Sequence, residues 1–200
     1  MPTVIERLQA EHARLAQLVQ LLDRQPSLSP DPDAPNIGLL VDALYYLTRF
    51  PDVSHHAIED RIVERLLGKN ALPTAFGHEI EAQHATLISQ GHELLQDLEA
   101  AVREENVSQE LVETHVRLYA ERLRHNMTVE ELTLFPAAVR HLNDDDWHAI
   151  GLPDVCGRPD PLFGGQVDER FAQLHQVITA EAAISIEGAR HQRSVRRLPY

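Results

Sequence analysis

Apolar residues recur at helical spacing along most of the first 142 residues, and this periodicity constrains the fold more than any other feature of the chain. In the first stripe, within about residues 3–24, the spacing alternates between three and four residues, which buries one face of a helix. Its members are Ile5, Leu8, His12, Leu15, Val19 and Leu22. The chain is therefore predicted to be all-α, with a histidine inside its first buried stripe.

Three further stripes predict three more long helices. The second helix should begin near Asn36 and be interrupted at Pro51, because proline lacks the backbone donor that a helix interior uses. The third should follow Pro73, and the fourth should run from the N-cap residue Ser108 to about Leu142. Together the four helices form two similar helical hairpins.

Residues 143–200 are predicted to lie outside this four-helix domain, which spans residues 1–142. They should contain a short helix capped by Asn143, a loop rich in proline and glycine, an amphipathic helix over about residues 167–187 that could dock on the main body, and a basic tail.

Composition excludes several classes of protein. A formal net charge of −13 disfavours nucleic acid and anionic lipid as partners. The single cysteine, Cys156, can form neither an internal disulfide nor a thiolate cluster. The most apolar stretch, Ile37 to Leu47, contains Asp42 and is too short to span a bilayer. We expect a soluble, cytoplasmic protein whose metal sites, if any, use His, Asp and Glu.

The histidines favour such a site, because four of them fall in or along the predicted buried stripes, one in each long helix. Helices that pair antiparallel bring these four rings to one level of the structure. Buried imidazoles and carboxylates without partners are costly, and cations would pair with both. Nitrogen and oxygen donors suit Fe, Mn or Zn, and two carboxylates suggest two ions. The candidate metal ligands are His12, His55, Glu59, His84, His125 and Glu130.

The two His/Glu pairs differ in spacing. His55 and Glu59 are four residues apart and share a helix face. His125 and Glu130 are five residues apart, which turns their side chains about 140° from each other on a regular α-helix. Both can point inward only if the helix is locally widened, so we predict a π-bulge between them. Regular bonding there would remove one of the two from the ligand set, and Glu131 is the spare candidate.

Other assignments remain open. A lone histidine in an apolar stripe is more often a core residue than a ligand, but four at one level favour a metal. His56 and Asp60 also have four-residue spacing and could replace the pair in the stripe. Glu81 and Glu121 lie one turn before His84 and His125 and could accept their second ring N–H.

Over about residues 1–142 the chain resembles the hemerythrin-like HHE cation-binding family. The resemblance lies in residues 9–12 (QAEH), 50–60 (FPDVSHHAIED), 83–84 (QH) and 125–136, which begin with His125 and end with Leu134-Phe135-Pro136. It implies an up-and-down antiparallel four-helix bundle around a non-haem, carboxylate-bridged di-iron centre. The cofactor would be two iron ions, which could also share an oxo bridge.

The chain departs from the oxygen carriers of this family at a ligand position. The oxygen carriers of the family use a second histidine one turn after the first on the third helix, where this chain has Ile88. The four-His, two-Glu set is more similar to hemerythrin-like repair and stress proteins. We therefore expect a protein that binds or reacts with O2, NO or peroxide in sensing, scavenging or iron handling. The alternatives are a di-iron oxidase or peroxidase, and a metal-free helical interaction protein.

Overall fold

The computed structural model describes residues 3–23, 37–103, 107–151 and 160–180. All regular elements within these ranges are helical, so the all-α prediction is confirmed. The chain divides into two compact units, Met1–Pro159 and Asp160–Tyr200. The domain boundary after residue 142 remains a prediction.

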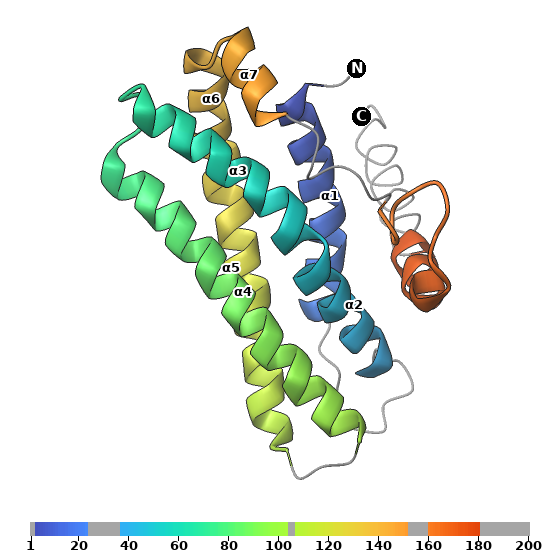
Figure 1. Ribbon diagram of the computed structural model, residues 1–200. Helices are drawn as coiled ribbons and strands as arrows, with labels where there is room; N and C mark the ends of the chain where they lie inside the picture. The colour runs from blue at the N-terminus through green and yellow to red at the C-terminus, as the bar shows by residue number, and fades with distance from the viewer. Residues whose placement is uncertain (1–2, 24–36, 104–106, 152–159, 181–200) are drawn as a thin grey trace, which may run out of the picture. The chain divides into compact units, whose positions relative to one another are not determined.

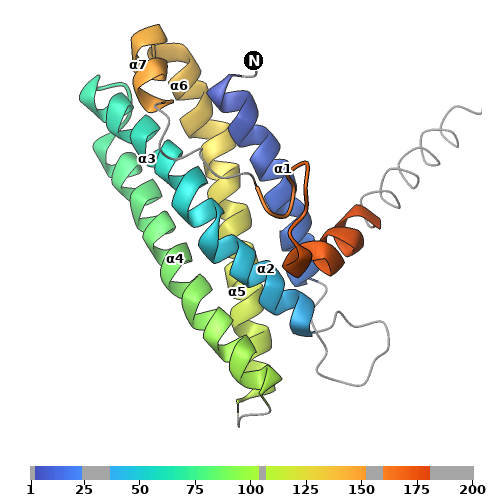
Figure 2. The same ribbon diagram turned by 45° about the vertical axis from the view of Figure 1, so that its right-hand side comes forward.

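The first unit contains a four-helix bundle whose successive rods run in opposite directions (Figure 1). The rods are α1 (Val4–Asp23), α2 with α3 (Ile37–Arg49 and Pro51–Gly68), α4 (Thr74–Val102), and α5 (Gln109–Val129) continued by a π-helix (Glu130–Leu134) and α6 (Phe135–His141). Both α2 and α3 pack against α4, while α5 packs against α4 and α1 (Figure 2). The up-and-down topology is confirmed.

The second rod breaks where the sequence predicts it. Helix α2 ends at Arg49, and Pro51 occupies the first turn of α3, where its missing N–H costs nothing. The backbone stays nearly helical across the break, because the Phe50 N–H donates to Tyr46 O and the Ser54 N–H donates to Phe50 O, both at 3.0 Å.

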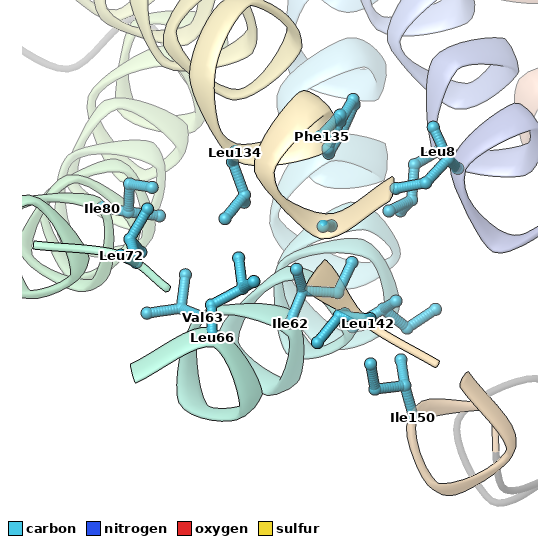
Figure 3. Packing of buried hydrophobic residues seen from close by; sticks show 13 residues of the cluster. Leu8, Ile62, Val63, Leu66, Leu72, Ile80, Leu134, Phe135, Leu142 and Ile150 are labelled. Atoms are coloured by element: carbon cyan, nitrogen blue, oxygen red, sulfur yellow. The ribbon is translucent and has the colours of Figure 1, made fainter. Parts of the chain in front are cut away.

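One end of the bundle is closed by an apolar cluster drawn from α1, α3, α4, α6 and α7, with Leu134 of the π-helix and Leu72 before α4 (Figure 3). Burial of apolar surface on this scale is the main force that holds the rods together. The residues labelled in the figure are Leu8, Ile62, Val63, Leu66, Leu72, Ile80, Leu134, Phe135, Leu142 and Ile150.

Helix α7 (Asp144–Ile150) packs against α3 and covers this end of the bundle. It begins with a capping box, in which the Asn143 side chain accepts the Asp146 N–H and the Asp146 carboxylate accepts the Asn143 N–H, both at 3.0 Å. The same carboxylate lies 2.8 Å from Lys69 Nζ, just beyond the end of α3. The predicted cap and short helix are confirmed.

The described part of the second unit begins with turns over residues 160–168. One turn of 3-10 helix, Glu169–Phe171, follows, and then an α-helix over residues 172–180. The helix predicted over about residues 167–187 is thus confirmed as far as residue 180. Its last turns and the basic tail lie outside the described residues. None of the described helices is long and apolar enough to cross a membrane.

Candidate metal centre

A polar cluster of four imidazoles and two carboxylates lies inside the bundle. Each side chain belongs to a residue that is at most 3% exposed. They are His12 from α1, His55, His56 and Glu59 from α3, His84 from α4, and Glu130 from the start of the π-helix. Polar groups buried to this extent require partners, so the contacts among them decide what the cluster can hold.

The two carboxylates lie between the imidazoles. His12 Nε2 is 3.4 Å from Glu59 Oε1 and 3.4 Å from Glu130 Oε2. His55 Nε2 is 3.1 Å from Glu59 Oε1. On the other side, His84 Nε2 is 2.8 Å from Glu130 Oε1 and 3.6 Å from Glu59 Oε2. Each carboxylate therefore directs one oxygen to each side of the cluster.

Several of these atoms have no hydrogen-bond partner among the described residues. They are Nε2 of His12 and of His55, both oxygens of Glu59, and Oε2 of Glu130. An unsatisfied buried polar atom costs about 1–3 kcal/mol, and more when it is charged. Five such atoms within one buried cluster, distributed over its two sides, fit a site for cations.

The donor atoms form two groups that share Glu59. One group is His12, His55 and Glu59, and the other is His56, Glu59 and His84. Within each group the donor atoms lie within 4.8 Å of one another, which matches ligands placed about 2 Å from a common ion. Imidazole and carboxylate donors without thiolate suit iron, manganese or zinc. The residues present therefore fit a metal centre, and the shared carboxylate fits two ions.

Three of the imidazoles are oriented by a carboxylate on their other ring nitrogen. The Nδ1 atoms lie 2.7–3.0 Å from a carboxylate oxygen, in the pairs His12 with Glu131, His55 with Glu11, and His84 with Asp60. A carboxylate at Nδ1 fixes the ring orientation and increases the basicity of Nε2. All three rings thus present Nε2 to the centre.

The charges of the imidazoles and carboxylates in the cluster strongly influence one another's pKa values. Burial disfavours the protonated ring of His12, but the carboxylates of Glu130 and Glu59 outweigh it and raise the pKa of His12 to about 10. Burial of His84 is likewise outweighed by Asp60 and Glu130, and its pKa is about 10. Burial also disfavours the ionised Glu130, yet His12 and His84 lower its pKa to about 2. Without metal, the opposite charges of these groups attract one another across the cluster, although His12 Nε2 and Glu130 Oε2 make no hydrogen bond.

The neighbouring histidines of α3 behave differently from each other. Burial of His55 is outweighed by Glu59 and by Glu11, which raise its pKa to about 9. Burial and the positive charges of His84 and His55 place the pKa of His56 well below its usual value. The His56 ring stacks on that of His84, with centroids 4.2 Å apart. His56 is therefore a neutral imidazole, the form that binds metals.

The structure does not bring His125 to the cluster, and the expectation that it points inward is wrong. Helix α5 is regular up to the Glu130 N–H, which donates to Asn126 O, so His125 and Glu130 stay about 140° apart. His125 is exposed on the surface of α5. The predicted π-helix exists but begins at Glu130, where the Phe135 N–H donates to Glu130 O, one turn later than expected.

His56 was predicted only as a replacement for His55, yet both rings are buried. Consecutive residues of a helix point about 100° apart, and α3 packs beside two other rods at the level of the cluster. His55 faces Glu11 and His12 of α1, while His56 faces His84 of α4. A bundle helix buries a face at least about 100° wide, so two consecutive residues can both be buried. That width could have identified His56 beside His55.

The acceptors for the outer ring nitrogens also differ from the prediction. Glu81 is exposed, and Glu121 pairs with Arg124 on the surface at 2.8 Å. Asp60 and Glu131, which the sequence offered as alternative ligands, serve as acceptors instead. Each immediately follows a buried glutamate in the chain.

The matching family is described as "Hemerythrin HHE cation binding domain", and its model covers residues 3–138. Comparison with curated proteins gives no match, and neither does comparison with solved structures. The family match includes every histidine and glutamate of the buried cluster and well over half of the chain. The chain therefore belongs to the hemerythrin HHE cation-binding domain family.

Proposed function

We propose that the protein holds two non-haem iron ions at this centre. One observation carries the proposal. Five buried atoms of the kind that bind metals, two imidazole nitrogens and three carboxylate oxygens, have no hydrogen-bond partner in the described structure. His12 and His55 would hold one ion and His56 and His84 the other, with the carboxylates of Glu59 and Glu130 available to both. His125 is replaced by His56 in this ligand set.

The charge balance supports two divalent or trivalent ions. Glu59 and Glu130 are both fully buried, and the acceptors Glu11, Asp60 and Glu131 add three further carboxylates around them. When metal binds, the protonated rings must release their protons, because imidazole binds metals only as the neutral form. The negative charge then left in the interior is balanced by the cations.

When bound, iron would supply reversible binding of O2 or NO, or redox reaction with O2 or peroxide. On that basis we propose a role in sensing, scavenging or iron handling. The chain's own residues orient the donors and exclude water. Phe135 stacks on the His12 ring at 5.3 Å, and Leu134 beside it is fully buried. A reducing, cytoplasmic location fits a chain with a single cysteine.

The test is the metal content of the protein purified aerobically, together with its visible spectrum. We expect about two iron ions per chain in the wild type and in His125→Ala, and less than about one in His84→Ala, because a buried ligand is lost only in the last. The two variants remove the same side chain, from an exposed position on α5 and a buried position on α4. Equal metal content in both variants, or none in the wild type, would contradict the proposal.

A further inference from the structure

The contacts around the centre form a ring with four corners, one at each interface between neighbouring rods. At each corner, a residue adjacent in sequence to an inner ligand contacts an inner polar side chain of the next rod. The four contacts are Glu11 with His55, Asp60 with His84, Gln83 with Asn126, and Glu131 with His12. Three corners pair a carboxylate with an imidazole, and the fourth pairs two amides.

Asn126 occupies the position at the fourth corner that an imidazole occupies at the others. It is 1% exposed and lies four residues before Glu130, the same spacing that His55 has to Glu59. Its Nδ2 donates to Glu130 Oε1 at 2.8 Å and to Gln83 Oε1 at 3.5 Å. The second contact is at the limit of hydrogen bonding, so this N–H can turn to another acceptor at small cost.

A surface pocket of about 260 Å³ lies outside this corner, between α4 and α5. Its lining residues are Glu79, Ala82, Gln83, Thr86, Leu87, Arg122 and His125. Gln83 belongs both to the pocket wall and to the fourth corner, and Asn126 connects it to Glu130 of the centre. A series of side-chain contacts therefore links the pocket wall, through Asn126, to the Glu130 oxygen that faces His84.

We propose that this fourth corner is the binding position for a small exogenous ligand, and that the pocket between α4 and α5 is its entrance. The chain places an amide there instead of a fifth imidazole, so one protein side chain fewer would hold the ion beside His84. Asn126 is a positioning residue that holds Glu130 and donates its second N–H to a ligand of two or three atoms that accepts hydrogen bonds. This inference rests on the proposed two-ion centre.

The first experiment closes the corner. In Asn126→His with Gln83→Glu, the fourth corner becomes an imidazole and a carboxylate like the other three. We expect the iron-loaded double variant to keep about two ions while its affinity for azide, measured by titration of the azide-to-iron absorption band, falls at least about tenfold. Full metal content with unchanged azide affinity would overturn the proposal. A second experiment on exposed residues tests the entrance without any substitution in the interior.

The second experiment blocks the pocket. Thr86→Trp and Ala82→Trp each place a large ring at an exposed position of the pocket wall. We expect azide association by stopped flow to slow at least about tenfold, with the equilibrium affinity and the metal content unchanged. The matched control is Thr114→Trp on α5, because both threonines donate to the carbonyl four residues earlier at 2.8 Å. Thr114 lies eight residues, or about 12 Å of helix, before the lining residue Arg122.

The outcomes separate the two proposals. A wild-type protein without bound metal refutes the proposed function. A metal-loaded protein in which both pocket variants bind azide as fast as the Thr114→Trp control refutes the entrance. Full metal content with unchanged azide affinity in the double variant refutes the corner, and neither result refutes the two-ion centre.

Discussion

The Nδ1 atom of His84 on α4 lies 2.7 Å from Oδ1 of Asp60 on α3. Asp60 directly follows Glu59, so two adjacent residues provide a carboxylate inside the centre and an acceptor for a histidine of the next rod. Glu130 and Glu131 do the same for His12. The orientation of His12, His55 and His84 is therefore set by a different rod from the one that carries each ring. The geometry of the centre depends on how the rods pack.

Replacing Asp60 tests this dependence. Asp60→Asn keeps the shape of the side chain but removes the charge that orients His84, so the affinity for metal should fall about 10- to 100-fold. A competition titration against a chelator measures the change. The control is Asp97→Asn, because Asp97 lies 3.4 Å from His115 Nδ1 in a half-exposed pair outside the centre. Equal affinity in the two variants would show that the contact between Asp60 and His84 does not support the site.

Much of the fold could be predicted from local signals. The stripe of α1 follows from its spacing, the break at Pro51 from the missing backbone donor, and the start of α7 from the Asn143 cap. Each of these depends on a few neighbouring residues. Such signals fix where helices begin and end and which face is buried.

The identity of the inner side chains could be predicted only in part. His12, His55, Glu59, His84 and Glu130 all lie in the cluster as expected. In both errors the buried position lies one residue further along the helix than the sequence predicts. The spacing predicts that His125 faces inward, but in the structure its neighbour Asn126 is the buried residue. The reason is that the π-helix begins at Glu130, and its position depends on packing between rods rather than on local spacing. The burial of His56 is missed because a single apolar stripe describes contact with one neighbouring rod, whereas α3 lies beside two.

Gly91 should be intolerant of a side chain. A Cβ there would lie 2.9 Å from Thr48 Cγ2 and 3.2 Å from Tyr119 Cε2, where α4 approaches α2 and α5 closely. Thr48 cannot turn away without losing its 2.8 Å hydrogen bond to Leu44 O. The overlap costs about 1–3 kcal/mol and the gain in helix propensity is about 1, so Gly91→Ala should lower the free energy of unfolding by about 1 kcal/mol. Urea denaturation measures it.

Gly68→Ala is the matched control for that substitution. Gly68 ends α3 with nothing within 4 Å of an added Cβ, and no described glycine has positive φ. Alanine should be neutral there or stabilise the protein by up to about 1 kcal/mol. Similar destabilisation in both variants would show that close packing at Gly91 is not the cause.

The stability of the metal-free protein should fall as the pH rises above neutrality. The pKa values of His12 and His84 are about 10, above the unfolded value of 6.5. A group whose pKa is higher in the folded state takes up protons on folding. Its contribution is therefore fully present below pH 6.5 and is lost as the pH rises towards 10. Chemical denaturation in the presence of a chelator, between pH 6 and pH 10, should show a steady loss of stability.

The metal-loaded protein provides the contrast for the pH series. Bound metal requires neutral imidazoles, so metal affinity should rise over the same range in which the metal-free protein loses stability. Uptake of metal at pH 7 should release protons, measurable in weakly buffered solution with an indicator dye. Metal uptake without proton release would mean that His12, His55 and His84 are neutral before metal binds.

The π-helix should be necessary for the centre because it keeps Glu130 and the following turn inward together. Glu130 at its start and Leu134 at its end are buried, as are Phe135 and Ala138 after it. Deleting the exposed Thr133 should restore regular α-helical hydrogen bonds. The helix before the deletion would then turn by about 100° relative to the helix after it. The apolar residues hold their side in the core, so Glu130 should swing out and the metal content should fall to about half or less. Thr133→Ala, which removes the side chain but keeps the extra residue, should retain full metal content, and a deletion variant that does so as well would refute this role of the π-helix.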